Sequence, residues 1–537
     1  MPSNQQDSIG LSSVSNQLLD SLDAIKPRQN VDDYTSIKVS QTVSFLALVY
    51  EKVRNAIEYR EDHLIRRAAI ERNLKRRLSL NPEGENEGEN VVRELLWARY
   101  FPNGSMGTRD VHEVQQIIDR YLLIKQKLLA GQTSKTRGYL SEFMFQLITA
   151  EIEEHLAPEA SVRESNFSYY IFQTLKEKVQ IEDVKEDQKD VYLFTAIEKA
   201  FRKSDIAYLR YHLFCLFYQP LSTYSETELN DIIPKLTDVC QTIDDMLKSP
   251  TVDKLVRFVR KQLPPFFILF SLLRDNPKER RSLLASKTSL WTKVEQIARN
   301  KYAEVRSRLN VLAFRSLIYI FITKMLFALA LEVPVSQFLF GYVHIPSIII
   351  NSVAPPIFML LIILGVSVPG DANTKNLFLR IVDILDADSS FEKTKALITK
   401  KVRQKRPLLS FGFTLLYTST FIITLYLIHL GLRAIDFNIL SESLFIFFIS
   451  IVAFFAYRIK QLSNMYRLVE KNSVFSPLID FFFMPILSLG KLFTEGVSRL
   501  NFFILIFDFI IEAPFKLIIE VIEEWISYVR QRKEEIV

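Results

Sequence analysis

The sequence predicts an all-α membrane protein, and three observations support this prediction. Glycine accounts for only 14 of the 537 residues, well below the usual share of roughly 7%. Tight turns and phosphate loops that need positive φ are therefore scarce. Apolar residues recur at spacings of three and four through much of 41–310, as amphipathic helices require. Long uncharged runs follow residue 310, and about 20 apolar residues suffice to cross a bilayer.

The first 310 residues read as a tail and a helical domain. Residues 1–40 are polar and weakly patterned, which predicts a flexible tail without a signal peptide. Residues 41–310 combine an ordinary density of charge with helical periodicity, and we expect them to form an all-helical cytoplasmic domain. Cys215 and Cys240 lie in apolar, helix-like contexts, so we expect two free thiols rather than a disulfide.

Four apolar segments predict two transmembrane hairpins separated by a basic connector at 370–407. Their only charged residues are Arg315 and Lys324 in the first segment and Glu442 near the start of the fourth. The predicted spans cover about 311–331 and 346–368 in the first hairpin (311–369), and about 408–432 and 437–457 in the second (408–458).

The distribution of basic residues predicts the orientation of these spans. Lys and Arg number five, zero, nine, one and four in the successive segments 291–310, 333–345, 370–407, 431–441 and 458–473. Cytoplasmic loops carry the excess of Lys and Arg in membrane proteins. The alternation therefore predicts a multi-pass protein of the cell membrane with both termini and the connector in the cytoplasm.

Two polar residues within the predicted spans are candidate functional residues. A cation such as Lys324 costs roughly 2.5–3.5 kcal/mol at the bilayer centre unless it is paired or hydrated. Either it serves a pathway with an acidic partner such as Asp480, Asp508 or Glu512, or its long side chain snorkels to an interface. Asn351 interrupts the second span, and it indicates either a broken-helix site or a packing contact.

We expect residues 459–537 to form amphipathic helices on the cytoplasmic face of the membrane. Charges and prolines interrupt 474–496, which favours an interfacial or re-entrant piece over a span. In 507–525 the charged residues gather on one arc of the helix, where Glu512 and Lys516 can pair. This pattern predicts a helix lying in the membrane plane with its acids toward water.

Two basic groups are candidates for contact with anionic lipid headgroups. A net charge of only +6 does not favour a nucleic-acid partner. The two groups are Arg72, Lys75, Arg76 and Arg77, and Lys400, Lys401, Arg403, Lys405 and Arg406.

Three stretches of sequence carry a resemblance to a group of known proteins. They are YEKVRNAIEYREDHLIRRAAIERNLKRRL (50–78), TKMLFALALEVP with INSVAPPIFMLLI (323–334 and 350–362), and FDFIIEAPFK (507–516). Together they resemble uncharacterised helical membrane proteins of small-genome, candidate-phylum bacteria. The resemblance implies a bacterial inner membrane, and because that group has no assigned activity it transfers no functional residue.

No catalytic, cofactor-binding or metal-binding residue is predicted. The sequence contains no GxxxxGK[ST], HExxH, CxxC or GxSxG pattern, the spacings that would identify phosphate, zinc, redox or nucleophile sites. The favoured hypothesis is a non-enzymatic scaffold or anchor whose helical domain binds a protein partner or a second copy of the chain. The alternatives are an oligomeric transporter or channel using Lys324 with an acid and, ranked last, a membrane enzyme acting on a lipid-linked substrate.

Overall fold

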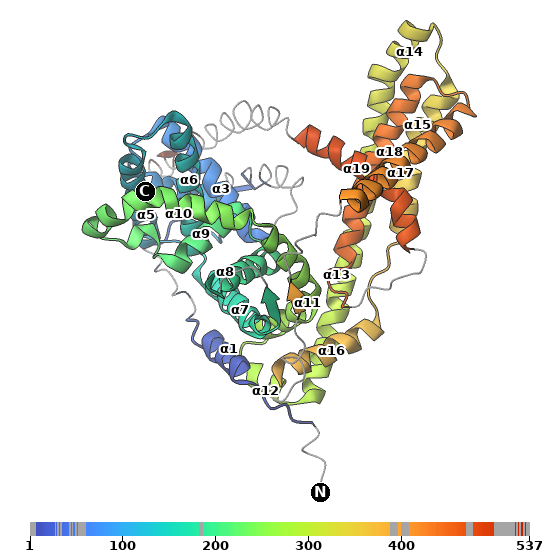
Figure 1. The fold of residues 1–537 in the computed structure, drawn as a ribbon. Coiled ribbons are helices and arrows are strands. Elements are labelled where there is room, and N and C mark those ends of the chain that lie inside the picture. Colours follow the sequence, from blue (N-terminus) through green and yellow to red (C-terminus); the bar gives the residue numbers. More distant parts are fainter. Residues whose placement is uncertain are drawn as a thin grey trace. The chain divides into compact units, whose positions relative to one another are not determined.

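The protein is all-α, as predicted (Figure 1). The computed structural model describes residues 7–26, 61–181, 186–386, 396–398, 407–468 and 476–498, with scattered positions within 28–51 and 521–532. In these parts of the chain the strand pairing is limited to three residues of β1 (Val179–Ile181), which run parallel to β2 (Ala396–Ile398).

The chain folds into two compact units, and neither is one continuous segment. The bundle unit consists of 1–10, 262–386 and 401–502, and the helical unit consists of 11–261, 387–400 and 503–537. The predicted domain boundary at 310 lies inside a single helix, α13 (Lys287–Phe327).

The helical unit is organised around α6, which packs against α3, α5 and α9. Side chains such as Phe143 and Leu147 of α6 are fully buried there. Its elements are α1 (Ser13–Asp23), α3 (Asp62–Leu80), α4 (Glu87–Trp97), α5 (Thr108–Leu129), α6 (Ser134–Leu156), α7 (Pro158–Lys176), α8 (Glu186–Ile197), η1 (Glu198–Arg202), α9 (Ile206–Phe217), η2 (Leu221–Thr223), α10 (Glu226–Leu247) and the first part of α11 (Pro250–Asp275).

Part of the expected flexible tail is a packed helix. Helix α1 begins where the Ser12 hydroxyl accepts a hydrogen bond from the backbone N–H of Ser15. Leu18, Leu19 and Leu22 are buried, and α1 packs on α7. Three leucines at helical spacing supply enough apolar surface to order the segment, although the polar residues around them hide the pattern.

The bundle unit contains the apolar helices. Its elements, after the second part of α11, are α12 (Arg280–Ala285), α13 (Lys287–Phe327), η3 (Ala328–Glu332), α14 (Val333–Phe340), α15 (Ile345–Leu364), α16 (Asp371–Leu385), α17 (Pro407–Arg433), α18 (Ile439–Ser463) and α19 (Ser476–Ser498).

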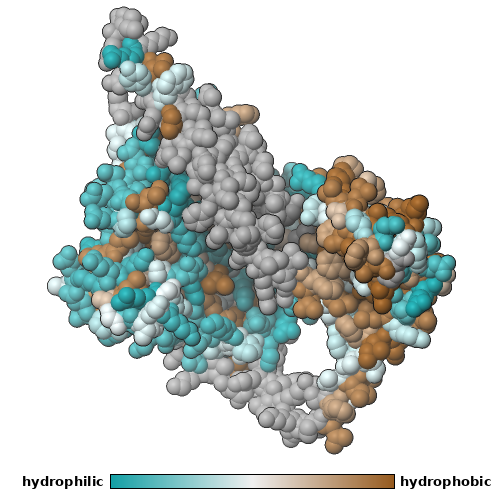
Figure 2. All heavy atoms as spheres, turned by 90° about the horizontal axis from the view of Figure 1, so that it is seen from above, coloured by the Kyte–Doolittle hydropathy of each residue, from teal (hydrophilic) through white to brown (hydrophobic). Residues whose placement is uncertain are grey.

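Four helical segments of the bundle unit are long and apolar enough to cross a membrane, as predicted. They are Lys287–Leu339, Ile345–Leu364, Phe411–Arg433 and Ile439–Gln461. Large apolar side chains cover their surface (Figure 2); Phe338 is 85% exposed and Phe411 is 68% exposed. Apolar surface on this scale marks an interaction with another molecule or a membrane, and together with the helix lengths it suggests a multi-pass membrane protein.

Helix α13 runs without interruption from a polar part, about 287–310, into the first candidate span. We call this polar part the stalk. The 41 residues of α13 correspond to about 60 Å at 1.5 Å per residue.

Helix α16 packs beside the polar part of α13, with the rings of Trp291 and Phe378 5.1 Å apart. The Asn373 side chain donates to the Tyr302 hydroxyl and the Tyr466 carbonyl, both at 2.8 Å, and accepts from the backbone N–H of Leu468 at 2.9 Å.

Helix α19 is a further member of the bundle. It packs along α18 and also contacts α17, and its Phe493 ring lies 4.9 Å from that of Phe447. Gly490 approaches α18 most closely, since an added Cβ would lie 2.0 Å from the Ser450 carbonyl oxygen. Ser450 lies near the middle of α18, so the segment expected to be interfacial or re-entrant reaches the central layer of the bundle.

The close approach at Gly490 makes a specific prediction. Gly490→Ala must separate α19 from α18, and we expect it to destabilise the bundle by about 1–3 kcal/mol through overpacking. Gly412→Ala in α17 is the matched control, because no atom lies within 4 Å of an added Cβ there. Thermal unfolding in detergent would show a lower Tm for Gly490→Ala alone. Equal Tm values for the two variants would contradict the packing described.

Candidate functional site

A buried polar cluster lies inside the bundle unit, built from Lys324, Glu332 and Asn351. All three side chains are 0% exposed. Lys324 lies near the end of α13, Glu332 ends η3, and Asn351 lies in α15. We call these three residues the intramembrane cluster, because all three belong to candidate membrane spans.

A π-helical turn positions Glu332 toward Lys324. In a regular α-helix, eight residues would place the two side chains about 80° apart around the axis. The π-turn η3 holds an extra residue, because its hydrogen bonds join residues five apart, and Val333 N–H accordingly donates to the Ala328 carbonyl. The wider turn rotates Glu332 back toward the face that carries Lys324.

Each charge of the cluster has a partner. Lys324 Nζ lies 3.4 Å from Glu332 Oε2 and 4.5 Å from the centre of the Phe448 ring. Asn351 Nδ2 donates to Glu332 Oε1 at 2.7 Å and to the Ser441 carbonyl at 3.0 Å. A buried charge is tolerated only when it is paired and hydrogen-bonded, and this arrangement meets that condition for both ions.

Some polar atoms near the middle of the bundle lack hydrogen bonds. Asn351 Oδ1, Thr424 Oγ1 and Ser450 Oγ are buried and have no hydrogen-bond partner in the described residues. Each such atom costs about 1–3 kcal/mol unless water or a ligand reaches it. The intramembrane cluster therefore retains one unused acceptor, the Asn351 carbonyl oxygen.

The partner found for Lys324 differs from those considered in the sequence. Glu332 stands one residue beyond the predicted first span (311–331), immediately before the uncharged run 333–369. The signal in the sequence was an acidic residue eight positions after Lys324. Only the π-turn brings two side chains at that spacing together. Asp480 lies in α19, and its side chain is not among those described. The other candidates, Asp508, Glu512 and Lys516, lie outside the described residues.

A second buried ionic cluster lies in the helical unit, and sequence reasoning missed it. His212 of α9 is hydrogen-bonded through Nδ1 to Glu198 and through Nε2 to Glu154, both at 2.7 Å. Arg202 pairs with Glu154 at 3.3 Å, with Glu164 at 3.2 Å and with Glu198 at 3.6 Å. We call these five residues the His212 cluster. Its signal in the sequence was the group of glutamates near the end of α6, at 151, 153 and 154.

Electrostatics fix the ionisation of the His212 cluster. Burial lowers the pKa of His212 and Arg202 lowers it further, but Glu154 and Glu198 outweigh both and raise it to about 9. Burial raises the pKa of each of these two carboxyls, yet the neighbouring Arg202 and His212 bring both down to about 2. His212 is therefore an imidazolium between two carboxylates. It stabilises the fold and does not serve as a general base near neutral pH.

No metal site emerges from the described residues, where no group of three or more His, Cys, Asp or Glu side chains could hold an ion. In the His212 cluster the Arg202 guanidinium occupies the place between the carboxylates. Both Cys215 and Cys240 are free thiols, as expected, and burial raises the pKa of each to about 12.

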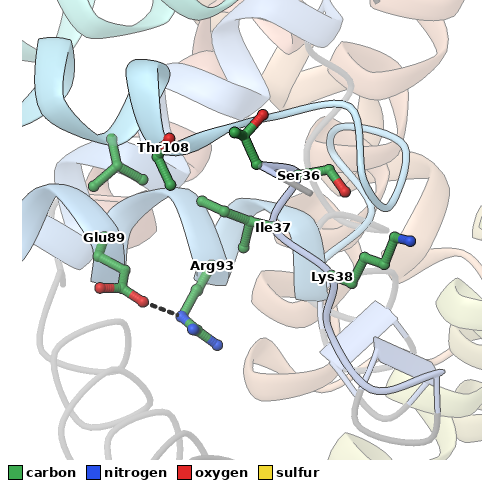
Figure 3. Close-up of a pocket in the computed structure, with 8 residues that line it drawn as sticks. Ser36, Ile37, Lys38, Glu89, Arg93 and Thr108 are labelled. Atoms are coloured by element: carbon green, nitrogen blue, oxygen red, sulfur yellow. Dashed lines mark hydrogen bonds and ion pairs between the residues drawn. The ribbon is translucent and has the colours of Figure 1, made fainter. Parts of the chain in front are cut away.

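A surface hollow of about 420 Å³ lies between α4, the start of α5 and the segment around residue 36 (Figure 3). Arg93 and Glu89 lie one turn apart on α4, and Arg93 Nε donates to Glu89 Oε1 at 2.8 Å. Glu89 offsets the charge of Arg93, and Lys38 adds one further cation to the lining. The hollow is lined by Thr35, Ser36, Ile37, Lys38, Glu89, Arg93, Thr108 and Val111.

The first basic group predicted to meet lipid headgroups is engaged within the helical unit. Arg72 pairs with Glu51 at 3.1 Å, and both Arg76 and Arg77 pair with Glu94. Lys75 is 44% exposed and pairs with Glu71 at 2.7 Å and Glu142 at 3.2 Å. These pairings leave little free charge for lipid. The second group, Lys400 to Arg406, lies outside the described residues.

Comparisons with protein-family models, with curated proteins and with solved structures found no match.

Replacing His212 should destabilise the helical unit. His212→Gln leaves two buried carboxylates with one cation fewer, and removing one partner of a buried pair costs about 3–5 kcal/mol. His112→Gln is the matched control, because His112 is exposed. Thermal unfolding in detergent at pH 6 should show a lower Tm for His212→Gln only.

The wild type and His212→Gln also test how stability depends on pH. His212 has a pKa of about 9 in the fold against its ordinary 6.5, so the proton stabilises the folded state. That contribution is complete below pH 6.5 and is lost as the pH rises to about 9. The difference in Tm between the wild type and His212→Gln should therefore shrink over this range. A difference that stays constant from pH 6 to pH 9.5 would contradict the assignment.

Proposed function

We propose that the protein is a non-enzymatic membrane scaffold or anchor that presents its helical unit to a protein partner. The observation that supports this proposal most is the stalk, because α13 continues unbroken from polar surroundings into the first candidate span. A helix without Pro, Gly or a π-turn over its polar half has no hinge. It can therefore extend the first candidate span as one rigid helix.

The contacts around Asn373 support the same proposal. They connect the stalk, α16 and the segment after α18, so the ends of two candidate spans are fastened to the extramembrane helices. Arg467 adds a further contact by donating to the Ser367 carbonyl at 2.8 Å. A permeation pathway does not require these contacts, whereas an anchor needs a firm connection between its spans and the helices outside them.

The orientation remains a proposal based on charge. Arg458 and Lys460 lie in the last turns of α18, which packs against α13 near Leu309, and Arg467 follows that helix; Arg433 ends α17, before the start of α18. The excess of basic residues supports a cytoplasmic location for the stalk end. The expected location is the cell membrane, with both termini cytoplasmic and, from the resemblance, the inner membrane of a bacterium.

Purification from native membranes tests the scaffold. The tagged full-length chain, extracted in mild detergent after chemical cross-linking, should recover one protein in constant stoichiometry, either a distinct partner or a second copy of the chain. The untagged chain carried through the same steps is the control. Repeated recovery of the protein as an uncross-linked monomer would refute the scaffold.

A second candidate function is an oligomeric transporter or channel, and the intramembrane cluster specifically favours it. Ionisable residues inside membrane helices commonly mark ion pathways, and π-turns recur at functional sites. Lys324 and Glu332 combine both features.

Flux measurements in liposomes test this second candidate. If the cluster lies on a pathway, Lys324→Met should reduce the flux of a permeant ion by about tenfold or more, as expected when at least 1.4 kcal/mol of favourable interaction is lost. Lys460→Met is the matched control, because Lys460 is exposed at the end of α18. The transport hypothesis would be abandoned if the wild type showed no flux, or if both variants conducted like the wild type.

A further inference from the structure

We propose that one outward face of α13 is a docking site for an anionic phospholipid. Arg308 and Arg315 hold the headgroup phosphate, and the apolar side chains that follow them hold an acyl chain. The inference rests on the proposed membrane location of the anchor, and it goes beyond the scaffold function by assigning a lipid class to one face. We call this face the lipid stripe, and it consists of Arg308, Val311, Arg315, Ile318, Ile322 and Leu326.

Arg315 is a charged residue of a candidate span that lacks a counter-ion among the described residues. Its side chain is exposed, and within the part of the chain that the structure describes it forms no ion pair or hydrogen bond. Lys324, nine residues further along the same helix, is instead fully buried and paired with Glu332. A cation at the edge of the hydrocarbon without a protein partner needs an anion from its surroundings. Lipid phosphates supply that anion at the bilayer surface.

The helix geometry brings the two arginines of the stripe together. Arg308 and Arg315 are seven residues apart, so they share a face and are separated by about 10.5 Å along the axis. Helical side chains tilt toward the N-terminus of their helix, and the Arg315 guanidinium therefore extends toward Arg308 and the stalk. The side chain of Arg308 is 74% exposed. Both guanidinium groups can therefore reach one phosphate at the interface, as long basic side chains do near helix ends.

The charge around the two arginines is positive. Residues 301–315 contain four basic side chains and one acidic side chain. The acid, Glu304, is shared by Lys301 at 3.0 Å and Arg308 at 2.5 Å, so these three residues keep one positive charge and Arg315 adds a second. This excess favours a headgroup with a net negative charge over a zwitterionic one. The planar guanidinium group also matches the paired oxygens of a phosphate.

The apolar part of the stripe begins one turn after Arg315. Ile318, Ile322 and Leu326 are 44%, 52% and 62% exposed, and their spacing places them on the same face as the arginines. From Arg315 to Leu326 the helix rises by about 16 Å, which is close to half of a hydrocarbon core of ~30 Å. The stripe therefore matches the depth of one leaflet, with its charged end at the headgroups.

The other side of α13 is already covered by protein. Leu309 and Ala313 are buried there, and Leu309 packs with Val452 and Ile459 of α18. Arg306 lies nine residues before Arg315, which places it about 180° from Arg315 around the axis. Arg306 is exposed, so it provides an equal charge on the same helix but outside the lipid stripe.

Binding is tested with purified full-length protein in detergent micelles, to which phosphatidylglycerol or phosphatidylcholine with the same acyl chains is added. A ligand that binds only the folded state raises Tm. Phosphatidylglycerol should therefore raise the Tm of the wild type until the site is saturated, whereas phosphatidylcholine should not. Soluble glycerol phosphate should have no effect, because it has no acyl chain for the apolar part of the stripe.

Three variants locate the site. Arg315→Gln should weaken the apparent affinity for phosphatidylglycerol about fivefold, since one basic residue near the membrane surface contributes about 1 kcal/mol and 1.4 kcal/mol is tenfold. Arg308→Gln should have a similar effect. Arg306→Gln is the matched control and should bind like the wild type. Because Arg315 is exposed and has no partner among the described residues, its replacement should leave the Tm without lipid unchanged.

The outcomes separate this inference from the scaffold. Equal responses to the two lipids, an equal loss in Arg306→Gln and Arg315→Gln, or a full response to glycerol phosphate would each overturn the lipid site. A disulfide-linked dimer of Ile322→Cys in native membranes would assign the stripe to a second copy and would also overturn it. A phosphatidylglycerol response that depends on Arg315, in a protein that recovers no partner, would support the lipid site and refute the scaffold alone.

Discussion

The need to pair every charge that leaves water dominates this structure. An isolated ion in a low-dielectric interior costs many kcal/mol, and only an opposite charge with additional hydrogen bonds offsets that cost. Both units contain such ions, and both use the same backbone device. The π-turn η3 brings Glu332 toward Lys324, and the π-turn η1 carries Glu198 and Arg202 into the His212 cluster. In each unit an irregular turn makes the charge pairing geometrically possible.

This constraint also explains where sequence reasoning succeeded. The all-α class and the four apolar helices follow from composition and periodicity, which average over many residues and tolerate local irregularity. The polar Lys324 was identified because a charge in an apolar run is conspicuous. These features depend on the hydrophobic effect and on helix geometry, and both can be read along a single chain.

The remaining features depended on interactions between distant residues. No periodicity signals a π-turn, so Glu332 could not be matched to Lys324. His212, Glu154 and Glu198 come from three different elements, and only tertiary packing brings them together. Gly490 shows the same difficulty: its role depends on the Ser450 carbonyl opposite it. Helix α1 was missed because three leucines in a polar segment are a weak pattern until α7 covers them.

The interrupted path of the chain has a consequence for dissecting the protein. Strand β2 lies between the second and third candidate spans, yet it pairs with β1 of the helical unit. The chain therefore passes between the two units several times. A gene fragment that stops before the first span encodes a helical unit without β2, and a fragment that begins there lacks 1–10 and the residues from 262 through α12, which belong to the bundle unit. Neither half is an independent module that recombination or cloning can exchange intact.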